Sequence, residues 1–215
     1  MNITIFGASG RTGLLLMDKA LQQGHQVTAF VRQASRVTVR HPRLQVVEGS
    51  LENIDHLRRA LTGRQAVISA LGVARTLQHD PDVIEGIRNI VQAMSKEAVP
   101  RFIYQSVFLA HSRPGEFSFF ARNILRRIIR KEVEDHEVKE NLVQEGVQNY
   151  TIVRPVRLTN ELFSGKFHHG VTITSGEWMP SISRTDTAHF MLQQLEDKTY
   201  LNKAVRLMKT ITATN

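Results

Sequence analysis

The chain has 215 residues, of which 41% are hydrophobic and 22% are charged, and it contains no cysteine. This length suits one large α/β domain over residues 1–215 and is too short for two. The composition excludes a disordered chain, and the lack of cysteine excludes disulfides, thiolate catalysis and cysteine-based zinc sites, so we expect no metal.

The net charge is +8 and the isoelectric point is near 10.2, which raises the question of nucleic-acid binding. The basic residues are scattered without a helix-turn-helix, zinc or RNA-reading motif, so we expect no nucleic-acid partner. The densest basic cluster belongs to a predicted amphipathic helix at 117–131. A solvated face is typical of such a pattern. A membrane-surface or protein contact, and a field that attracts anionic cofactors, are the alternatives.

No signal-like segment precedes the first strand, and no apolar run approaches the ~18 residues that span a bilayer. The sequence therefore predicts a cytoplasmic protein without stable membrane insertion.

An apolar strand at 2–6 runs directly into a glycine-rich turn, and a helical pattern follows. The turn has the spacing Gly-x-x-Gly-x-x-Gly, formed by Gly7, Gly10 and Gly13. Gly7 allows a sharp exit from the strand, Gly10 lets a pyrophosphate approach the backbone, and Gly13 lets the helix pack closely on the sheet. The helix N-terminus and the Thr12 hydroxyl then offer donors to the phosphates. An ordinary tight turn between strand and helix is the alternative.

Strands and helices alternate along the rest of the chain. Strands are predicted at 26–31, 43–48, 66–70, 101–105 and 150–154, and helices at 54–61, 81–97, 117–144 and about 185–195. Repeated βα units predict an α/β fold, a Rossmann-type doubly wound parallel sheet in the order 3-2-1-4-5-6. Residues 155–215 are predicted to add a small substrate-side segment of short strands and one helix. Ser183 and Asp186 are placed to cap that helix reciprocally, so we interpret Asp186 as structural.

The end of the second strand discriminates between dinucleotides. An enzyme that prefers NAD commonly places a carboxylate there to bind the ribose 2′-hydroxyl. This chain instead carries Arg32, Ser35 and Arg36. Guanidinium groups offer a phosphate a fork of donors, so the sequence predicts NADP(H). Two surface arginines in a polar loop are the alternative.

From residue 3 to about 208 the chain resembles the atypical short-chain dehydrogenase/reductases of the NmrA-like type, and among these the flavin reductase (biliverdin-IX-beta reductase) group. The motifs that carry the resemblance keep their order and spacing along nearly the whole chain. They are Ile5 to Gly13, Val31-Arg32 with Ser35-Arg36, Ala66-Val67-Ile68 with Leu71-Gly72, Gly86 to Val91, Ser106 with Phe108-Leu109, Asp135-His136, Val153 with Pro155, and Asp186 with His189 to Leu192.

The resemblance implies an NADP(H) site at the carboxyl ends of the strands. Its implied cofactor contacts are Gly7, Ser9, Gly10, Arg11, Thr12, Gly13, Arg32, Ser35, Arg36, Ser50, Leu51, Leu71, Gly72, Ser106, Val107, Pro155 and Val156. The family usually has Gly-Asp after the third strand, where this chain has Gly49-Ser50, and Ser50 is expected to donate near the adenine.

The candidate catalytic residues are Ser106, His136 and Arg157. Ordinary short-chain dehydrogenases pair a serine with Tyr-x-x-x-Lys, whose tyrosine transfers a proton at the alcohol oxygen. Ser106 is in the expected place, but no Tyr-x-x-x-Lys occurs, and about thirteen residues on the chain has phenylalanines at 119 and 120. His136 matches a family histidine near the active site, with a surface or capping role as the alternative. Arg157 replaces a histidine of the flavin reductases, and we expect it to bind an anionic acceptor.

The resemblance favours an NADP(H)-dependent oxidoreductase that reduces a planar conjugated acceptor, such as a flavin or quinone. The cofactor then supplies the hydride and solvent can supply the proton. We expect residues 117–120 to border the substrate cleft and the protein to be a monomer or homodimer. The alternative is a non-catalytic NmrA-like NADP(H) sensor that acts through a partner protein.

Overall fold

The structure is a computed structural model, which describes residues 1–72, 79–112, 127–174 and 179–210. Its strands are β1 (Asn2–Phe6), β2 (Gln26–Val31), β3 (Leu44–Glu48), β4 (Ala66–Ser69), β5 (Arg101–Gln105), β6 (Asn149–Pro155), β7 (Arg157–Thr159), β8 (Phe167–Gly170), β9 (Ser181–Ser183) and β10 (Lys203–Lys209). Its helices are α1 (Arg11–Gln22), the short 3-10 helix η1 (Ala34–Arg36), α2 (Ile54–Leu61), α3 (Pro81–Lys96), α5 (Arg130–Gly146) and α6 (Arg184–Gln193).

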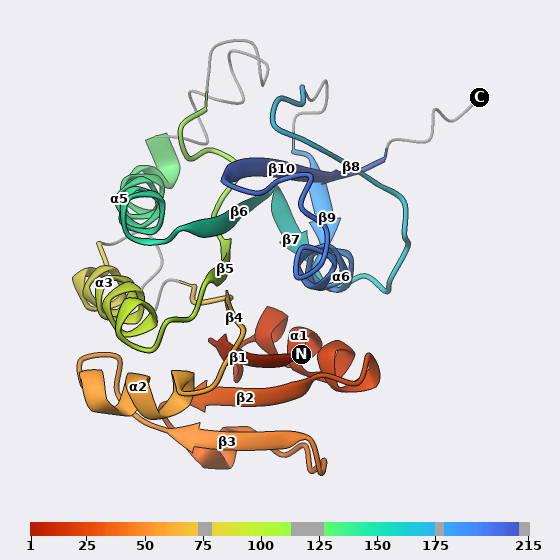
Figure 1. Ribbon diagram of the computed structural model, residues 1–215. Helices are drawn as coiled ribbons and strands as arrows, with labels where there is room; N and C mark the ends of the chain where they lie inside the picture. The colour runs from red at the N-terminus through yellow and green to blue at the C-terminus, as the bar shows by residue number, and fades with distance from the viewer. Residues whose placement is uncertain (73–78, 113–126, 175–178, 211–215) are drawn as a thin grey trace.

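In the described residues, an eight-stranded sheet with the order β3-β2-β1-β4-β5-β6-β10-β8 forms the centre of the fold. Strands β1 to β6 are parallel, β10 extends the sheet parallel to β6, and β8 closes it in the antiparallel direction. The predicted order 3-2-1-4-5-6 of a doubly wound α/β fold is therefore confirmed. Helices α1 and α6 cover one face, and α2, α3 and α5 cover the other (Figure 1).

The first strand shows why the sheet is buried on both sides. Successive side chains of a strand point to opposite faces. Ile3 and Ile5 belong to the apolar cluster beneath α1 and α6, whereas Phe6 belongs to the cluster beneath α2 and α3. Residues 3–6 are all buried, as expected of a parallel strand that is covered on both faces.

Two predictions need correction in detail. The predicted continuous helix 117–144 is interrupted at Ile129, whose ψ of 28° lies outside helical geometry and which precedes α5. The part of this prediction at 117–126, with its amphipathic pattern and phenylalanines, lies outside the described residues. The segment after residue 155 also contributes more than short strands, because the seven-residue β10 joins the main sheet beside β6.

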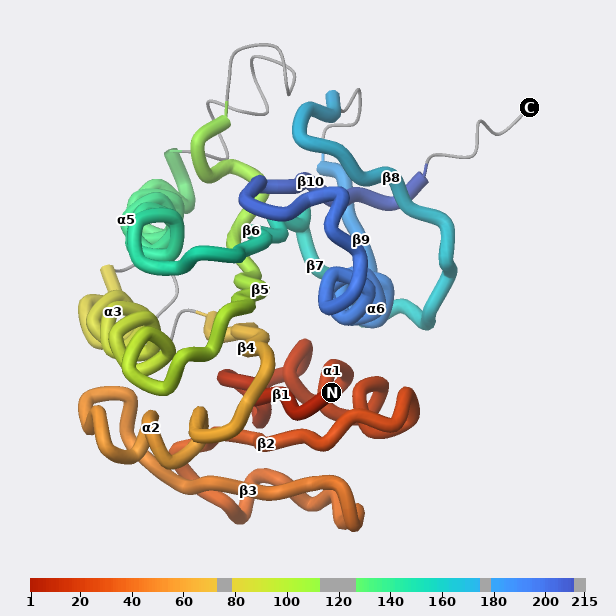
Figure 2. Tube along the Cα trace, viewed as in Figure 1, coloured from red at the N-terminus to blue at the C-terminus, as the bar shows by residue number. Residues whose placement is uncertain are grey.

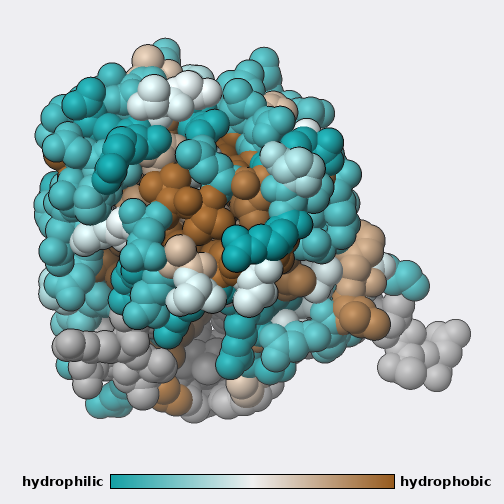
Figure 3. Space-filling view, turned by 90° about the horizontal axis from the view of Figure 1, so that it is seen from below, coloured by the Kyte–Doolittle hydropathy of each residue, from teal (hydrophilic) through white to brown (hydrophobic). Residues whose placement is uncertain are grey.

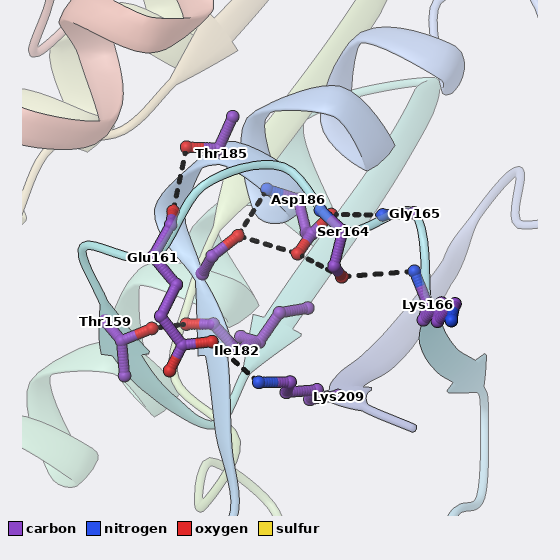
Figure 4. A network of polar contacts seen from close by, with 10 residues as sticks. Thr159, Glu161, Ser164, Gly165, Lys166, Ile182, Thr185, Asp186 and Lys209 are labelled. Atoms are coloured by element: carbon purple, nitrogen blue, oxygen red, sulfur yellow. Dashed lines mark hydrogen bonds and ion pairs between the residues drawn. The ribbon is translucent and has the colours of Figure 1, made fainter. Parts of the chain in front are cut away.

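A small parallel pair, β7 with β9, lies beside the main sheet, and the N-terminus of α6 follows β9 directly. The Asp186 carboxylate accepts hydrogen bonds from the backbone N–H groups of Ser164 and Gly165, and from the hydroxyls of Ser164 and Ser183 (Figure 4). Ser183 in turn caps α6 by accepting from the Asp186 N–H. These contacts agree with a structural role for Asp186. They go beyond the predicted cap, because the carboxylate accepts from the Ser183 hydroxyl and from the loop at Ser164 and Gly165.

Within the described chain, no helix is long and apolar enough to cross a bilayer. The trace in Figure 2 shows β3 at one edge of the sheet, with β2 as its strand neighbour. Figure 3 shows the molecule from below relative to Figure 1, and on that face apolar surface gathers in the middle with hydrophilic side chains around it. On β3, Leu44, Val46 and Val47 are only partly buried.

Candidate dinucleotide and acceptor site

The glycine turn after β1 is shaped by close backbone packing. Gly7 has a φ of +75°, and a Cβ there would lie 2.7 Å from the carbonyl oxygen of Ala70. A Cβ on Gly13 would lie 2.7 Å from the carbonyl carbon of Gly7. By contrast, a Cβ on Gly10 would meet only the Gly7 carbonyl oxygen within 4 Å, at 3.1 Å. Gly7 and Gly13 are therefore needed for the turn itself, whereas the space in front of Gly10 is open.

The N-terminus of α1 faces this open space without a side-chain cap. Its N-cap is Gly10, and the first turn carries no acidic residue. Uncapped N–H groups at a helix N-terminus, together with the helix dipole, form a binding site for an anion. Burial, with the nearby charge of Arg11, lowers the pKa of Arg184. Arg11 and Arg184 thus lie near enough to interact electrostatically.

The residues predicted to bind the 2′-phosphate lie in the loop after β2. Arg32, Ser35 and Arg36 are exposed, directly after β2 and within η1. A carboxylate does lie beside this loop, however, because Glu48 at the end of β3 accepts the Ala34 N–H at 2.7 Å. Glu48 on β3 thus holds the backbone of this loop. The side chains of Arg32 and Arg36 remain exposed to solvent.

The other adenine-side positions differ in what they offer. The Ser50 hydroxyl accepts the Glu52 N–H at 3.2 Å. Leu51 packs on the face of α3, since a Cβ on Gly86 would lie 2.7 Å from its side chain. Leu51, which follows β3 in the chain, therefore packs against α3.

A cavity of about 530 Å³ opens at the carboxyl ends of β4, β5 and β6. Most of its lining is apolar. The lining residues are Leu71, Gly72, Gln105, Ser106, Val107, Phe108, Leu109, Ile129, Glu132, His136, Pro155, Val156, Arg157, Leu158, Met179, Pro180 and Arg184. All three candidate catalytic residues and the implied nicotinamide-side residues thus meet in one space. The glycine turn, the arginine loop and Ser50 with Leu51 lie outside its lining.

His136 is not a surface residue. Its side chain is 3% exposed, and its Nδ1 lies 2.9 Å from the Tyr104 hydroxyl. Burial, with the charges of Glu140 and Asp135, raises the pKa of Tyr104 well above its usual value. Burial and the Lys139 charge lower the pKa of His136 well below its usual value. Both groups are therefore neutral near pH 7.

The tautomer of His136 follows from this contact. Among the described residues, the Tyr104 hydroxyl has no other hydrogen-bond partner. A hydroxyl that only accepted would leave its own hydrogen buried and unpaired, so we infer that it donates to Nδ1. A neutral imidazole carries one hydrogen, which then sits on Nε2. His136 is consequently a hydrogen-bond donor in the cavity wall and not a cationic acid.

Ser106 is tied to a buried ion pair. Its hydroxyl donates to Oε1 of Glu140 at 2.5 Å. Arg154 on β6 holds the same carboxylate with two hydrogen bonds, from Nε at 2.9 Å and from Nη2 at 2.5 Å. Glu140 is fully buried and Arg154 is 6% exposed. The pair connects the residue directly after β5 to α5 and β6.

Two further ionisable groups lie on α5. Burial raises the pKa of Glu132. The charge of Lys139 lowers this pKa in part, and the charge of Asp135 raises it further. Burial lowers the pKa of Lys139, against the attraction of Asp135, Asp80 and Glu132. The Lys139 ammonium is buried and has no hydrogen-bond partner within the described chain. Lys139 is fully buried and does not line the cavity.

The sequence interpretation missed Tyr104, Glu140, Arg154, Glu132 and Arg184 as parts of the site. One local signal was present: Glu132, His136 and Glu140 follow each other at intervals of four. Residues four apart share one face of a helix. A helix face that carries only ionisable groups indicates that it meets a polar site or other buried charges.

A metal site is a different matter. The described residues contain no group of three or more histidines and carboxylates arranged to hold a metal ion.

The comparisons with known proteins agree with this geometry. The profile of the NAD(P)H-binding family matches residues 7–198. The chain therefore belongs to the NAD(P)H-binding family. A fungal oxidoreductase, aflX from Aspergillus parasiticus, is 24% identical over 91% of this chain and 79% of its own length. For other curated relatives, the aligned region spans only 27% to 64% of their own length.

Solved structures show the same fold. A short-chain dehydrogenase/reductase from Veillonella parvula, determined in complex with NADP, has a TM-score of 0.79 and 24% identity, over 99% of this chain and 96% of its own. A Streptococcus pneumoniae protein, provisionally described as an NADH-flavin reductase, has a TM-score of 0.74 and 18% identity, over 98% of this chain and 100% of its own.

The residues of this chain fit a dinucleotide. The open space in front of Gly10 and the uncapped N-terminus of α1, which begins with Arg11, suit a pyrophosphate. A Cβ on Gly72 would meet nothing within 4 Å, so the cavity is also open after β4. Arg184, which lines the cavity, donates through Nη1 to the Leu158 carbonyl and to Oδ1 of Asn160.

Proposed function

We propose that the protein is an NADP(H)-dependent reductase of a planar conjugated acceptor, such as a flavin or a quinone. The observation that carries this proposal is the largely apolar cavity at the carboxyl ends of β4, β5 and β6. Ligands of open α/β sheets bind at this end of the strands. A volume of about 530 Å³ lies within the range of small-molecule pockets.

In this proposal, the chain holds the cofactor along the ends of its strands. The α1 N-terminus and Arg11 bind the pyrophosphate, and Arg32 with Arg36 binds the 2′-phosphate. The nicotinamide reaches the cavity beside Ser106 and Pro155. The NADP complex of the Veillonella relative, which has the same fold, supports NADP(H) as the cofactor.

The cofactor, when bound, supplies the hydride, and the chain orients the acceptor and excludes water. Apolar walls suit a flat aromatic ring, and Arg157 at the wall suits an anionic substituent. The neutral His136 offers a hydrogen bond to the ring and keeps its proton. The fungal relative named as an oxidoreductase and the pneumococcal protein described as an NADH-flavin reductase support this class of reaction.

The test is an oxidation assay with NADPH and with NADH against FMN, riboflavin and uncharged quinones, alongside cofactor binding by fluorescence titration. Riboflavin has the ring of FMN without its phosphate, so it is the matched control for charge. Arg157→Ala should raise KM for FMN about tenfold and leave KM for riboflavin and quinones nearly unchanged.

Tight binding of NADPH without reduction of any acceptor above the background rate would contradict this proposal. The non-catalytic NADP(H) sensor would then lead. A curated relative over 98% of this chain is named as a photosystem II assembly factor, and it is 24% identical. That name shows that an assembly role occurs in a related protein.

A further inference from the structure

Ser106 lines the cavity directly after β5. Its side chain is 2% exposed, and its backbone N–H is bound to the Val153 carbonyl at 2.7 Å. The position of this hydroxyl is therefore fixed by the sheet. Whether this hydroxyl can donate a hydrogen bond to a ligand depends on which acceptor already binds its single hydrogen.

Glu140 takes that hydrogen. Its carboxylate is fully buried and receives two hydrogen bonds from Arg154, which an arginine gives to an ionised carboxylate. His111 adds a further nitrogen 3.7 Å from Oε2. An ionised carboxylate has no hydrogen to give, so the hydrogen between Oε1 and the Ser106 hydroxyl comes from the serine. A ligand that took this hydrogen would leave a buried carboxylate oxygen with one donor fewer.

We propose that Ser106 acts towards the cavity only as a hydrogen-bond acceptor, and that the group it receives is an amide-type N–H of the bound ligand. This inference rests on the proposed function and narrows its ligands. Two planar groups that would enter the cavity carry such an N–H: the carboxamide of the nicotinamide, and the imide edge of a flavin-type ring. A simple ketone, which can only accept, finds no donor at this serine.

His136 supplies the complementary group. Tyr104 donates to its Nδ1, so its remaining polar atom is an Nε2 donor. Ser106 on the β5 side and His136 on α5 both line the cavity. The wall thus offers one acceptor and one donor, which is the pattern that an amide group with its N–H and C=O requires. An alcohol substrate would need the Tyr-x-x-x-Lys pair that the chain lacks.

The experiment uses two pairs of ligands that differ at one N–H. The first pair is riboflavin and N3-methylriboflavin. The second pair is NADPH and its reduced 3-acetylpyridine analogue, in which a methyl group replaces the carboxamide NH2. Dissociation constants are measured by fluorescence titration on wild-type protein and Ser106→Ala. Ser95→Ala, at an exposed position on α3, is the matched control.

We expect wild-type protein and Ser95→Ala to bind the N–H member of at least one pair about tenfold more tightly, and Ser106→Ala to bind both members within about twofold. The pair that discriminates identifies the source of the N–H. Ser106→Thr, which keeps the hydroxyl, should keep the discrimination. If Ser106→Ala does not fold, Ser106→Cys takes its place, because sulfur is a weak acceptor.

Equal affinities within both pairs in the wild-type protein would overturn the inference. Discrimination that persists in Ser106→Ala would also overturn it, since the methyl group would then act by its size. Because binding is measured without turnover, a protein that binds NADPH but reduces no acceptor would refute the proposed function and still report on Ser106.

Discussion

Replacing Gly13 by alanine should destabilise the fold, because the third helical residue of α1 leaves no room for a methyl group. An ideal Cβ there would lie 2.7 Å from the Gly7 carbonyl carbon and 2.8 Å from the Ala8 Cα, and closer still to the Gly7 carbonyl oxygen. All three atoms belong to the backbone, so no side chain can rotate away. Overpacking of this kind costs up to about 3 kcal/mol, and the better helix propensity of alanine returns about 1 kcal/mol. We therefore expect a net loss of about 2 kcal/mol.

The assay is urea denaturation followed by circular dichroism, with Gly10→Ala and Gly72→Ala as matched glycine replacements. Gly72→Ala should leave the free energy of unfolding nearly unchanged, because a Cβ there meets nothing within 4 Å. Gly10→Ala has a single close contact of 3.1 Å, so it should fold and still weaken NADPH by tenfold or more, since its methyl group enters the phosphate space. If Gly13→Ala is as stable as the wild type with the same m-value, the packing argument for this turn is refuted.

Arg36→Ala should weaken NADPH by about ten- to a hundredfold and leave NADH nearly unchanged, because only the 2′-phosphate needs the guanidinium; an equal loss for both cofactors in binding titrations would refute this assignment. The buried His136 should make the protein sensitive to acid. Its folded pKa lies well below that of the unfolded state, so the unfolded state alone takes up the proton as pH falls through about 6.5. Relative to His136→Gln, the wild type should lose about 1.4 kcal/mol of unfolding free energy between pH 7.5 and 5.5, and parallel pH profiles in urea denaturation would contradict this. Asp186→Asn should lower stability by about 1–3 kcal/mol, because a neutral amide cannot accept all the donors that converge on this carboxylate; an unchanged melting temperature would show that these contacts contribute little. Burial raises the pKa of Asp186 and the hydrogen bonds lower it, with a net lowering, so its contribution to stability should persist at neutral pH and be lost as pH falls below about 3.8.

The main sheet could be predicted from the sequence because its signals are local. An apolar run such as Ile3 to Phe6, followed by glycines and a helix, has few other structures available. Strand β10 gave no comparable signal, since it begins and ends with lysine, at Lys203 and Lys209. Its place in the sheet depends on pairing with β6, about fifty residues earlier in the chain, and no local pattern records such a pairing.

The candidate site also has parts that are local in the sequence and parts that depend on distant residues. The glycine turn and the arginine loop are continuous segments, so their residues could be named from sequence. The contact of Ser106 with Glu140 joins residues 34 positions apart, and Tyr104 with His136 joins residues 32 apart. Such contacts are fixed by how α5 packs against the sheet. The surface or capping alternative for His136 is wrong for the same reason, because a lone histidine in a helix does not reveal which face is covered.

The hydrogen bonds around Asp186 also determine how one wall of the cavity can move. The amide groups of Ser164 and Gly165 are held by a carboxylate on α6, and Arg184, at the start of that helix, lines the cavity. These amides can exchange with solvent only after the carboxylate releases them. The loop and the first turn of α6 should therefore open together as one unit of local unfolding. Hydrogen exchange would then show equal protection for the amides of Ser164, Gly165 and Asp186, and bound ligand would slow all three to the same extent.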